Sequence, residues 1–492
     1  MSETRWRVLL ALIVVFTLAR IAMTHRVFSQ TVDEASHLIA GYDILTKRVY
    51  TTDIHHPPLA RVLFALPFIG EPDPAVLEGD LSRGTVLLLR NDRYTQNVAR
   101  ARMPNLLFVA VAIIGLAYWA RRLFTPGAGL LAALIFASLP PVLAHGGLAT
   151  TDMALTATLI VALYVFTLVL EDATWRRTIA LGLALAAGLL AKYSFLAYFP
   201  ACALVLVVVR RRFPFTKIVW ALVIALAIVW LAMPPQAFLA GLESVRAQTR
   251  HPPRGILFGE VREGGWWYYF PVALFFKTPI PFLILAIAGL RRRLELALMA
   301  AAILAIAMTG NINIGVRHVL PIYAPLAIGA AAAIRVRWLN IALIAWLAIG
   351  SAFAHPDYLA WFNAFAGREP QRILNDSNLD WGQDALRLVR YARKEKIQSI
   401  TTSLPWSAPL DRIGLPPRAD LQILQPVHGW LAISELNIAL GRAYSPEVRR
   451  WLDRLLADRP YRRVGKTIRL YSFDSLPVPR GPLPGHSRPG DT

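Results

Sequence analysis

The sequence predicts a mainly α-helical, polytopic membrane protein with a small α/β domain near its C-terminal end. Of its 492 residues, 56% are hydrophobic and only 17% are charged, whereas soluble domains carry charges on about 25% of their residues. Apolar runs recur along residues 1–354 and approach the roughly 17 to 25 residues that a helix needs to cross a bilayer. The formal net charge of +21 lies largely in short basic clusters between these runs. This pattern orients membrane helices and does not indicate nucleic-acid binding.

About eleven transmembrane helices are expected in residues 1–354. The first run is predicted to be an uncleaved span, because no small-residue cleavage site follows it before Asp33. If the chain starts in the cytoplasm, eleven spans place the basic clusters on the cytoplasmic side, as membrane topology favours. This arrangement requires residues 179–209 to form a hairpin of two short spans, with Lys192 and Tyr193 at the outer turn. The candidate spans are Val8–Thr24, Pro104–Trp119, Ala128–Leu143, Met153–Leu170, Ile179–Leu190, Phe195–Val209, Ile218–Met233, Pro271–Leu290, Leu294–Met308, Val316–Ile334 and Trp338–Phe353.

The first outer loop, residues 25–102, carries the acidic pair Asp33-Glu34 and the histidine pair His55-His56. A carboxylate facing lipid is costly, so the two acids are either solvated at the interface or turned into the protein to work. Adjacent histidines of an extended chain point to opposite sides and do not easily share one ion. We therefore assign no metal ligands, although a divalent metal stays open. Contact with an anionic substrate, or hydrogen bonding beside Pro57-Pro58, is expected instead. Residues Val76–Leu89 are predicted to lie along the membrane surface.

Polar residues at the outer ends of later spans complete the candidate site. Asp152 stands where a span begins, so it caps that helix, faces a cavity shared with the acidic pair, or does both. Lys192 and Arg317 lie at outer ends of spans, against the usual cytoplasmic bias of basic residues. Snorkelling of Lys192 and carbonyl capping by Arg317 are structural explanations. A lipid phosphate is a functional one, because arginine binds it through a planar fork and lysine as a point charge. His318 and Lys277 are further candidates on this side.

The loop Pro234–Phe270 is rich in charge and carries near its end a cluster of glycines and aromatic residues, Gly264-Gly265-Trp266-Trp267-Tyr268-Tyr269. Aromatic residues at such an edge form an interfacial belt. Alternatively, they form a mobile cover over a site, hinged at the two glycines. Both interpretations stay open.

After Phe353 the chain becomes charged and amphipathic, and residues 355–474 are predicted to form a small α/β domain on the non-cytoplasmic face. Asp380 and Gln383 resemble a capping box, and Ser445-Pro446 resembles a helix start. Residues 475–492 are rich in proline and glycine and are predicted to be disordered. The expected elements are helices at Asp380–Lys396 and Pro446–Ala457 and strands near Ile397–Ser403, Leu421–Gln425 and Thr467–Phe473.

Several stretches together resemble one family of membrane enzymes. They are the acidic pair and the segments His56–Ala60 (HPPLA), His145–Met153 (HGGLATTDM), Gly315–Tyr323 (GVRHVLPIY) and Phe362–Asp384 (FNAFAGREP…NDSNLDWGQD). In this order and spacing the chain is similar to the bacterial branch of the GT-C glycosyltransferases related to protein O-mannosyltransferases and aminoarabinose transferases. The resemblance implies a polyprenyl phosphate that carries one sugar as donor. It also implies inverting transfer to a hydroxyl of protein Ser/Thr, or of an envelope glycan or lipid, on the non-cytoplasmic side of the plasma (inner) membrane.

The resemblance also implies roles for single residues. Asp33 corresponds to the catalytic acid of the first loop, and Glu34 to its neighbour that positions the acceptor or that acid. Asp152 corresponds loosely to the acid of the second loop, and Arg317 to a basic group near the donor phosphate. His56 stands where aminoarabinose transferases carry a lysine near this phosphate. The WGQD segment receives no catalytic role.

The expected chemistry needs a base and a cation. A carboxylate takes the proton of the acceptor hydroxyl as this hydroxyl attacks the anomeric carbon, and Arg317, with Lys192 or His56, stabilises the charge on the departing phosphate. Repulsion between two close carboxylates is expected to leave Glu34 partly protonated and Asp33 ionised as the base. The residues expected to contact the acceptor or to support these groups are Asp152, His318 and Lys277.

The main alternative is a secondary transporter or flippase of a lipid-linked or anionic substrate. A transporter should show internal repeats and charges at mid-span, whereas the ionisable groups here stand at span ends. A non-catalytic scaffold would not require acids and bases from separate loops to gather on one face. The expected partners are therefore a polyprenyl-phosphate sugar, its acceptor and the lipid bilayer, with no nucleic acid.

Overall fold

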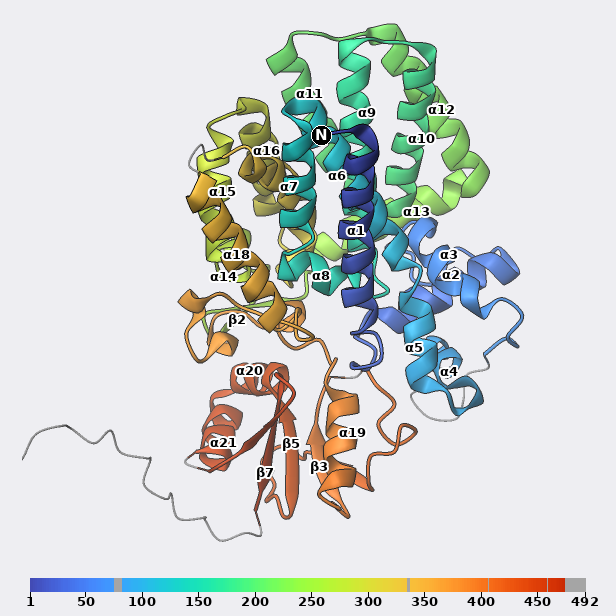
Figure 1. Ribbon diagram of the computed structural model, residues 1–492. Coiled ribbons are helices and arrows are strands. Elements are labelled where there is room, and N and C mark those ends of the chain that lie inside the picture. The colour runs from blue at the N-terminus through green and yellow to red at the C-terminus, as the bar shows by residue number, and fades with distance from the viewer. Residues whose placement is uncertain (75–81, 334–336, 406, 458, 474–492) are drawn as a thin grey trace, which may run out of the picture.

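A computed structural model describes residues 1–74, 82–333, 337–405, 407–457 and 459–473. It has a body of long helices with a smaller, sheet-containing domain at one end, and the N-terminus lies toward the opposite end of the body (Figure 1). The tail predicted to be disordered falls outside the described residues. So does most of the first half of the segment predicted to lie along the membrane, whose second half forms a short helix, α4 (Arg83–Leu89).

Each of the eleven predicted spans coincides, within its described residues, with one helix or with two consecutive helices. By length and composition, three stretches of the described chain are able to cross a membrane alone, Tyr94–Leu123, Asp152–Glu171 and Phe215–Ala232. Two bent pairs also qualify, so the number of eleven crossings stays a prediction. The elements of the body are α1 (Glu3–Ala22), α6 (Asn105–Leu123), α7 (Pro126–Phe136), α8 (Pro140–Gly146), α9 (Asp152–Glu171), α10 (Trp175–Ala191), α11 (Phe195–Arg210), α12 (Phe215–Ala232), α14 (Tyr269–Lys277), α15 (Ile280–Leu290), α16 (Leu294–Thr309), the 3-10 helix η3 (Val316–Ile322), α17 (Tyr323–Ala331) and α18 (Arg337–Phe353).

Two predicted spans are broken where prolines interrupt the helical hydrogen bonds. Helices α7 and α8 meet at 70° before Pro140, and α14 and α15 meet at 117° near Pro279. A proline has no N–H to donate and clashes with the preceding turn, so a bend at these points is expected. The turn of the predicted hairpin is found where expected: α10 and α11 are separated by a short turn that contains Lys192 and Tyr193, whereas the two crossings stay a prediction.

Ion pairs join several helix ends at the end of the body that holds the N-terminus. Arg121 lies 2.7 Å from Glu3, and Arg122 lies 2.7 Å from Glu171. Arg210 approaches both Glu171 and Glu295 at 3.4 Å. These basic clusters therefore gather at one end of the body, as the predicted topology requires.

The long outer loops are structured. The first contains α2 (Glu34–Lys47), α3 (Pro58–Ala65), η1 (Leu66–Phe68), α4, η2 (Arg90–Asp92) and α5 (Tyr94–Arg102). The loop between α12 and α14 contains α13 (Pro235–Arg250) and an antiparallel hairpin of β1 (Arg254–Leu257) and β2 (Glu260–Glu263). Both loops lie on the side of the body toward the sheet domain (Figure 1).

The C-terminal domain contains a five-stranded sheet in the order β4-β3-β5-β7-β6. Strand β3 is parallel to β4 and β5, whereas β7 is antiparallel to β5 and β6. Its elements, with the short helices that precede them, are η4 (Ala364–Ala366), η5 (Pro370–Arg372), η6 (Asp376–Asn378), α19 (Ala385–Lys394), β3 (Ile400–Ser403), β4 (Arg418–Asp420), β5 (Trp430–Ser434), α20 (Glu435–Tyr444), α21 (Pro446–Leu456), β6 (Arg462–Val464) and β7 (Ile468–Ser472).

The α/β content of this domain is confirmed, but two local predictions are wrong. Helix α19 begins at Ala385, and no capping box forms because the Asp380 carboxylate accepts from the backbone of Gly382 and Leu436 instead. The strand predicted at 421–425 is not formed, since Leu424 adopts a left-handed φ of 66°, which a strand does not allow. The Ser445 cap is confirmed, because its hydroxyl accepts from the N–H of Val448.

The crossing of α15 and α17 depends on glycine. A Cβ added at Gly289 would lie 2.0 Å from the carbonyl oxygen of Gly329, so the two backbones can approach this closely only without that side chain. We expect Gly289→Ala to lower the free energy of unfolding by about 1–3 kcal/mol, as overpacking typically does.

Gly350 in α18 is the matched control, because a Cβ there meets nothing within 4 Å. Gly350→Ala should be neutral or stabilising by up to about 1 kcal/mol, because alanine favours the helix. Thermal unfolding of both variants in detergent tests this. Equal effects at the two positions would contradict it.

Candidate active site

A cavity of about 460 Å³ lies between the outer loops and the outer ends of the body helices. It brings together five of the eight predicted site residues, which come from the first outer loop, the α10–α11 turn and η3. They are Asp33, His56, Lys192, Arg317 and His318. A sixth, Asp152, is fully buried directly beneath this lining and pairs with two of them.

Arg317 is the centre of the charged network. Its Nη1 donates to Oδ2 of Asp33 at 2.9 Å and lies 3.6 Å from Oδ2 of Asp152. Lys192 donates to the other oxygen of Asp152. Two cations and two carboxylates therefore alternate from Asp33 through to Lys192. Asp33 is the most accessible member, with 28% of its side chain exposed, against 6% for Arg317.

Local structure explains why these groups meet. Asp33 precedes the first residue of α2, Asp152 opens α9, and Lys192 directly follows α10. Neither Asp33 nor Thr151, the residue at the cap of α9, makes a side-chain cap bond. The carboxylate of Asp152 is thus used for ion pairing, while its place at the start of α9 still suits the positive end of the helix dipole.

Three histidines of the first outer loop, His37, His55 and His56, line the cavity beside this network. His37 lies 3.2 Å from Asp53, and its ring meets that of His56 edge-on with centroids 4.8 Å apart. His55 contacts Ser244 of α13 instead, 2.6 Å from its hydroxyl. Burial, reinforced by the nearby positive charge of Lys192, holds the pKa of His56 well below its usual range, so this ring is neutral at pH 7. Among the described residues, no three His, Cys, Asp or Glu side chains gather as metal ligands would.

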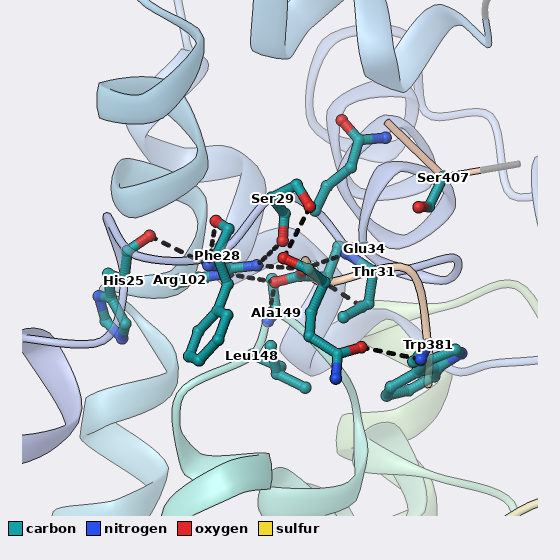
Figure 2. Close-up of polar contacts among 12 residues, drawn as sticks. His25, Phe28, Ser29, Thr31, Glu34, Arg102, Leu148, Ala149, Trp381 and Ser407 are labelled. Atoms are coloured by element: carbon teal, nitrogen blue, oxygen red, sulfur yellow. Dashed lines mark hydrogen bonds and ion pairs between the residues drawn. The ribbon is translucent and has the colours of Figure 1, made fainter. Parts of the chain in front are cut away.

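Glu34 has a different environment from Asp33, although the two are adjacent. Its carboxylate receives two bonds of 2.7 Å from Arg102 and one of 2.8 Å from each of the backbone N–H groups of Ala149 and Thr31. Figure 2 shows this cluster, in which Arg102 also donates to backbone carbonyls of residues 25–29. Glu34 is turned into the protein and does not line the cavity, because successive residues of a helix point about 100° apart.

The expected partial protonation of Glu34 is wrong. Burial alone would raise its pKa, but Arg102 and the two N–H groups outweigh burial and lower the pKa of Glu34 below the ordinary value of 4.5. Glu34 is thus an ionised group that holds α2, the first outer loop and the turn before α9 together.

Lys277 also lies away from the cavity. Its ammonium group donates to the carbonyl oxygens of Leu359, Trp361 and Asn378, and it lies 4.1 Å from the centroid of the Phe362 ring. These contacts bind the end of α14 to the segment that leads into the C-terminal domain. The structure therefore gives no support to a contact between Lys277 and an acceptor.

Sequence reasoning missed two contributions to the site. The first is the segment Asn375–Asp384, which packs against η3: the Trp381 ring lies 4.3 Å from the guanidinium of Arg317. Asp376 of this segment is close enough to interact electrostatically with Arg317 and Asp33, and burial raises its pKa to about 6. The second is the end of α13, where Gln248 and His251 line the cavity. The NDSNLDWGQD motif was the available signal for the first, and the charge-rich loop Pro234–Phe270 was the available signal for the second.

The fold is shared with a protein of known structure. The structure matches ArnT from Cupriavidus metallidurans bound to undecaprenyl phosphate with a TM-score of 0.53 and 13% identity, over 96% of this chain and 98% of that chain. The apo state of the same protein matches with a TM-score of 0.52, the same 13% identity and the same coverage. At this identity the likeness shows a shared fold. Together with the apolar helices, it identifies the chain as an integral membrane protein.

A more particular likeness comes from the sequence. The model of the family described as dolichyl-phosphate-mannose-protein mannosyltransferase matches residues 94–234, which is less than half of the chain. A search of curated proteins finds no match. The family match, together with the fold shared with ArnT, confirms the resemblance to GT-C glycosyltransferases that the motifs predicted.

The Glu34–Arg102 pair is expected to stabilise the fold and not to act in chemistry. Glu34→Gln leaves Arg102 buried without a counter-charge, so the free energy of unfolding should fall by about 3–5 kcal/mol. Asp33→Asn is the matched comparison at the neighbouring, more exposed position, and it should lower the unfolding temperature much less. The opposite order of the two effects would contradict this assignment.

The same pair predicts a pH dependence of stability. The folded-state pKa of Glu34 lies below its ordinary 4.5, so ionised Glu34 stabilises the fold fully above that value. The contribution is lost as the pH falls toward the lower, folded-state pKa. Unfolding temperatures between pH 7 and pH 3 should therefore decline less steeply in Glu34→Gln than in the wild type. Parallel curves would show that Glu34 contributes nothing to the acid sensitivity.

Proposed function

We propose that this protein transfers a sugar from a polyprenyl-phosphate donor to an acceptor hydroxyl, with inversion at the anomeric carbon. The observation that carries the proposal is the juxtaposition of Asp33 and Arg317 in one cavity, 2.9 Å apart. The fold supports it, because ArnT has the same fold and was solved with undecaprenyl phosphate. The mannosyltransferase family model supports glycosyl transfer as the reaction class.

The cavity has the groups that a sugar phosphate requires. Arg317 and Lys192 supply positive charge, and the rings of His56 and His318 can supply hydrogen bonds. Nε of Arg317 and Nε2 of His318 are buried and have no hydrogen-bond partner among the residues that the structure describes. Buried polar atoms are normally paired, so unpaired atoms around a cavity favour a polar ligand there.

Donor binding is proposed to free the catalytic base. In the structure the Asp33 carboxylate accepts a hydrogen bond from Arg317, so it is engaged in an ion pair and not with an acceptor. The donor phosphate competes with Asp33 for Arg317, which leaves Arg317 on the phosphate and Asp33 unpaired at the cavity. Asp152 remains with Lys192 and keeps the buried charges balanced.

The bond changes then follow directly. The acceptor oxygen attacks the anomeric carbon and gives its proton to Asp33, while the bond between that carbon and the phosphate oxygen breaks on the opposite face. Arg317 and Lys192 stabilise the charge that develops on the departing polyprenyl phosphate. Protein Ser/Thr and envelope glycans or lipids are all acceptors that this chemistry allows.

The orientation in the membrane is part of the proposal. With the basic clusters at the N-terminal end of the body in the cytoplasm, the cavity and the C-terminal domain lie on the non-cytoplasmic side of the plasma membrane. About eleven crossings agree with this orientation, since the N-terminus and the C-terminal domain lie toward opposite ends of the body (Figure 1).

Asp33→Asn is expected to lower the transfer rate about 10²- to 10⁴-fold, the usual contribution of a general base. The assay follows release of undecaprenyl phosphate from undecaprenyl-phosphate sugars by the purified protein, with cell-envelope extract as the acceptor source. The matched control is Asp73→Asn, because Asp73 is an exposed carboxylate of the same loop that pairs with Lys47 and Arg83. Full activity of Asp33→Asn would exclude this role. Movement of intact donor across vesicle membranes without product would favour the flippase alternative.

Arg317→Gln is expected to weaken binding of undecaprenyl phosphate about 10- to 100-fold, because it removes a charged hydrogen-bond donor from the phosphate. Arg317→Lys should retain part of the affinity, since it keeps the charge and loses the planar fork. The control is Arg246→Gln on α13, whose side chain is 75% exposed. Native mass spectrometry of the detergent-solubilised protein measures the affinities, and unchanged binding by Arg317→Gln would contradict the proposed phosphate site.

A further inference from the structure

The segment Asn375–Trp381 interlocks with the backbone around Arg317. The N–H of Val316 donates to Oδ1 of Asn378 at 2.9 Å, and the hydroxyl of Ser377 donates to the carbonyl of Ile314 at 2.6 Å. A Cβ at Gly315 would lie 2.1 Å from the Ser377 hydroxyl oxygen, so this close approach requires glycine. The backbone just before Arg317 is thus held by residues that lie about 60 positions later in the chain.

The same segment is anchored to the helical body. Nδ2 of Asn378 donates to the hydroxyl of Tyr269 at 2.7 Å, and the carbonyl oxygen of Asn378 accepts from Lys277. Asn378 and Tyr269 are both fully buried. Buried hydrogen bonds of this kind fix position, because breaking one leaves a polar group without a partner. The residues that hold Arg317 are therefore immobilised against α14.

The guanidinium itself rests on an aromatic face. Its central carbon lies 4.3 Å from the centroid of the Trp381 ring, which is 3% exposed. The backbone N–H of Trp381 donates to the side-chain oxygen of Gln383, and the Trp381 ring meets that of His145 with centroids 6.3 Å apart. A planar guanidinium that packs on a ring keeps its donors in a defined plane. Trp381 thereby limits the orientations in which Arg317 can present its fork to the cavity.

We propose that Trp381, together with Ser377 and Asn378, is a positioning residue for Arg317, so that the segment leading into the C-terminal domain completes the phosphate site. This inference rests on the proposed function, because it concerns the affinity of Arg317 for a phosphate. It assigns a role to the NDSNLDWGQD motif: the motif touches no reacting atom and acts through Arg317.

A double-mutant cycle on the full-length protein tests this, with binding of undecaprenyl phosphate as the readout. Trp381→Leu should weaken binding about 5- to 30-fold, the size of a cation–π contact with a desolvated cation, whereas Trp381→Phe should restore most of the affinity. In the Arg317→Gln background, Trp381→Leu should have less than about a twofold further effect, since a positioning residue has nothing left to position.

Ser377→Ala provides a second variant that adds no bulk. It removes one hydrogen bond to the Ile314 carbonyl and should weaken binding about two- to tenfold, again only when Arg317 is present. Trp430→Leu, at the start of β5, is the control for the integrity of the domain. It should lower the unfolding temperature and leave phosphate binding unchanged.

The possible outcomes distinguish a failure of the positioning role from a failure of the proposed function. Equal losses from Trp381→Leu with and without Arg317, or unchanged binding in both Trp381→Leu and Ser377→Ala, would overturn the positioning role while the phosphate site stands. Absence of undecaprenyl-phosphate binding by the wild-type protein would overturn the proposed function and this inference with it.

Discussion

Arg317 is a cation held where water hardly reaches it, and the site depends on how its charge is balanced. Removing an ion from water costs several kcal/mol unless a partner compensates, and here Asp33 and Asp152 do so from different segments of the chain. Lys192 makes the group of four formally neutral. Asp33 is its most exposed member, so it is the carboxylate that an incoming phosphate displaces at the lowest cost. In the proposed reaction, the same ion pair that stabilises the substrate-free protein becomes the base and the phosphate receptor.

The neighbouring residue shows how local geometry separates chemistry from stability. Asp33 and Glu34 are adjacent residues that both carry a carboxylate. Asp33 faces the cavity, whereas Glu34 is enclosed by Arg102 and backbone N–H groups. Lys277 and Arg317 form a similar contrast among the cations, because Lys277 is saturated by carbonyl oxygens of the segment before the C-terminal domain. A buried charge thus has a structural role where its partners are complete and is available for a ligand where they are not.

The body of the fold could be predicted from the sequence because bilayer thickness and apolar length are directly linked. All eleven apolar segments are helical in the described residues, and the hairpin inferred from the balance of basic clusters places Lys192 at its turn as expected. Elements of the C-terminal domain were less predictable, since short strands such as β5 depend on neighbours and not on periodicity. The strand expected near 421–425 failed because the backbone of Leu424 adopts a left-handed φ.

For the site, the position of basic residues at outer span ends indicated Lys192 and Arg317, because such residues are rare enough to be informative. The motif resemblance assigned roles to Asp33 and Arg317. The resemblance placed Glu34 in the site beside Asp33, whereas a helical rotation and the position of Arg102 turn Glu34 away from the cavity. It also gave no role to Trp381, since contacts between residues 317 and 381 are set by tertiary packing.

The most direct test of the central claim is a structure of the protein with undecaprenyl phosphate bound, determined in a lipid nanodisc. We expect the phosphate within hydrogen-bonding distance of Arg317 and Lys192, with the contact between Asp33 and Arg317 opened and Asp152 still paired with Lys192. A phosphate bound elsewhere, with the Asp33–Arg317 pair intact, would contradict it.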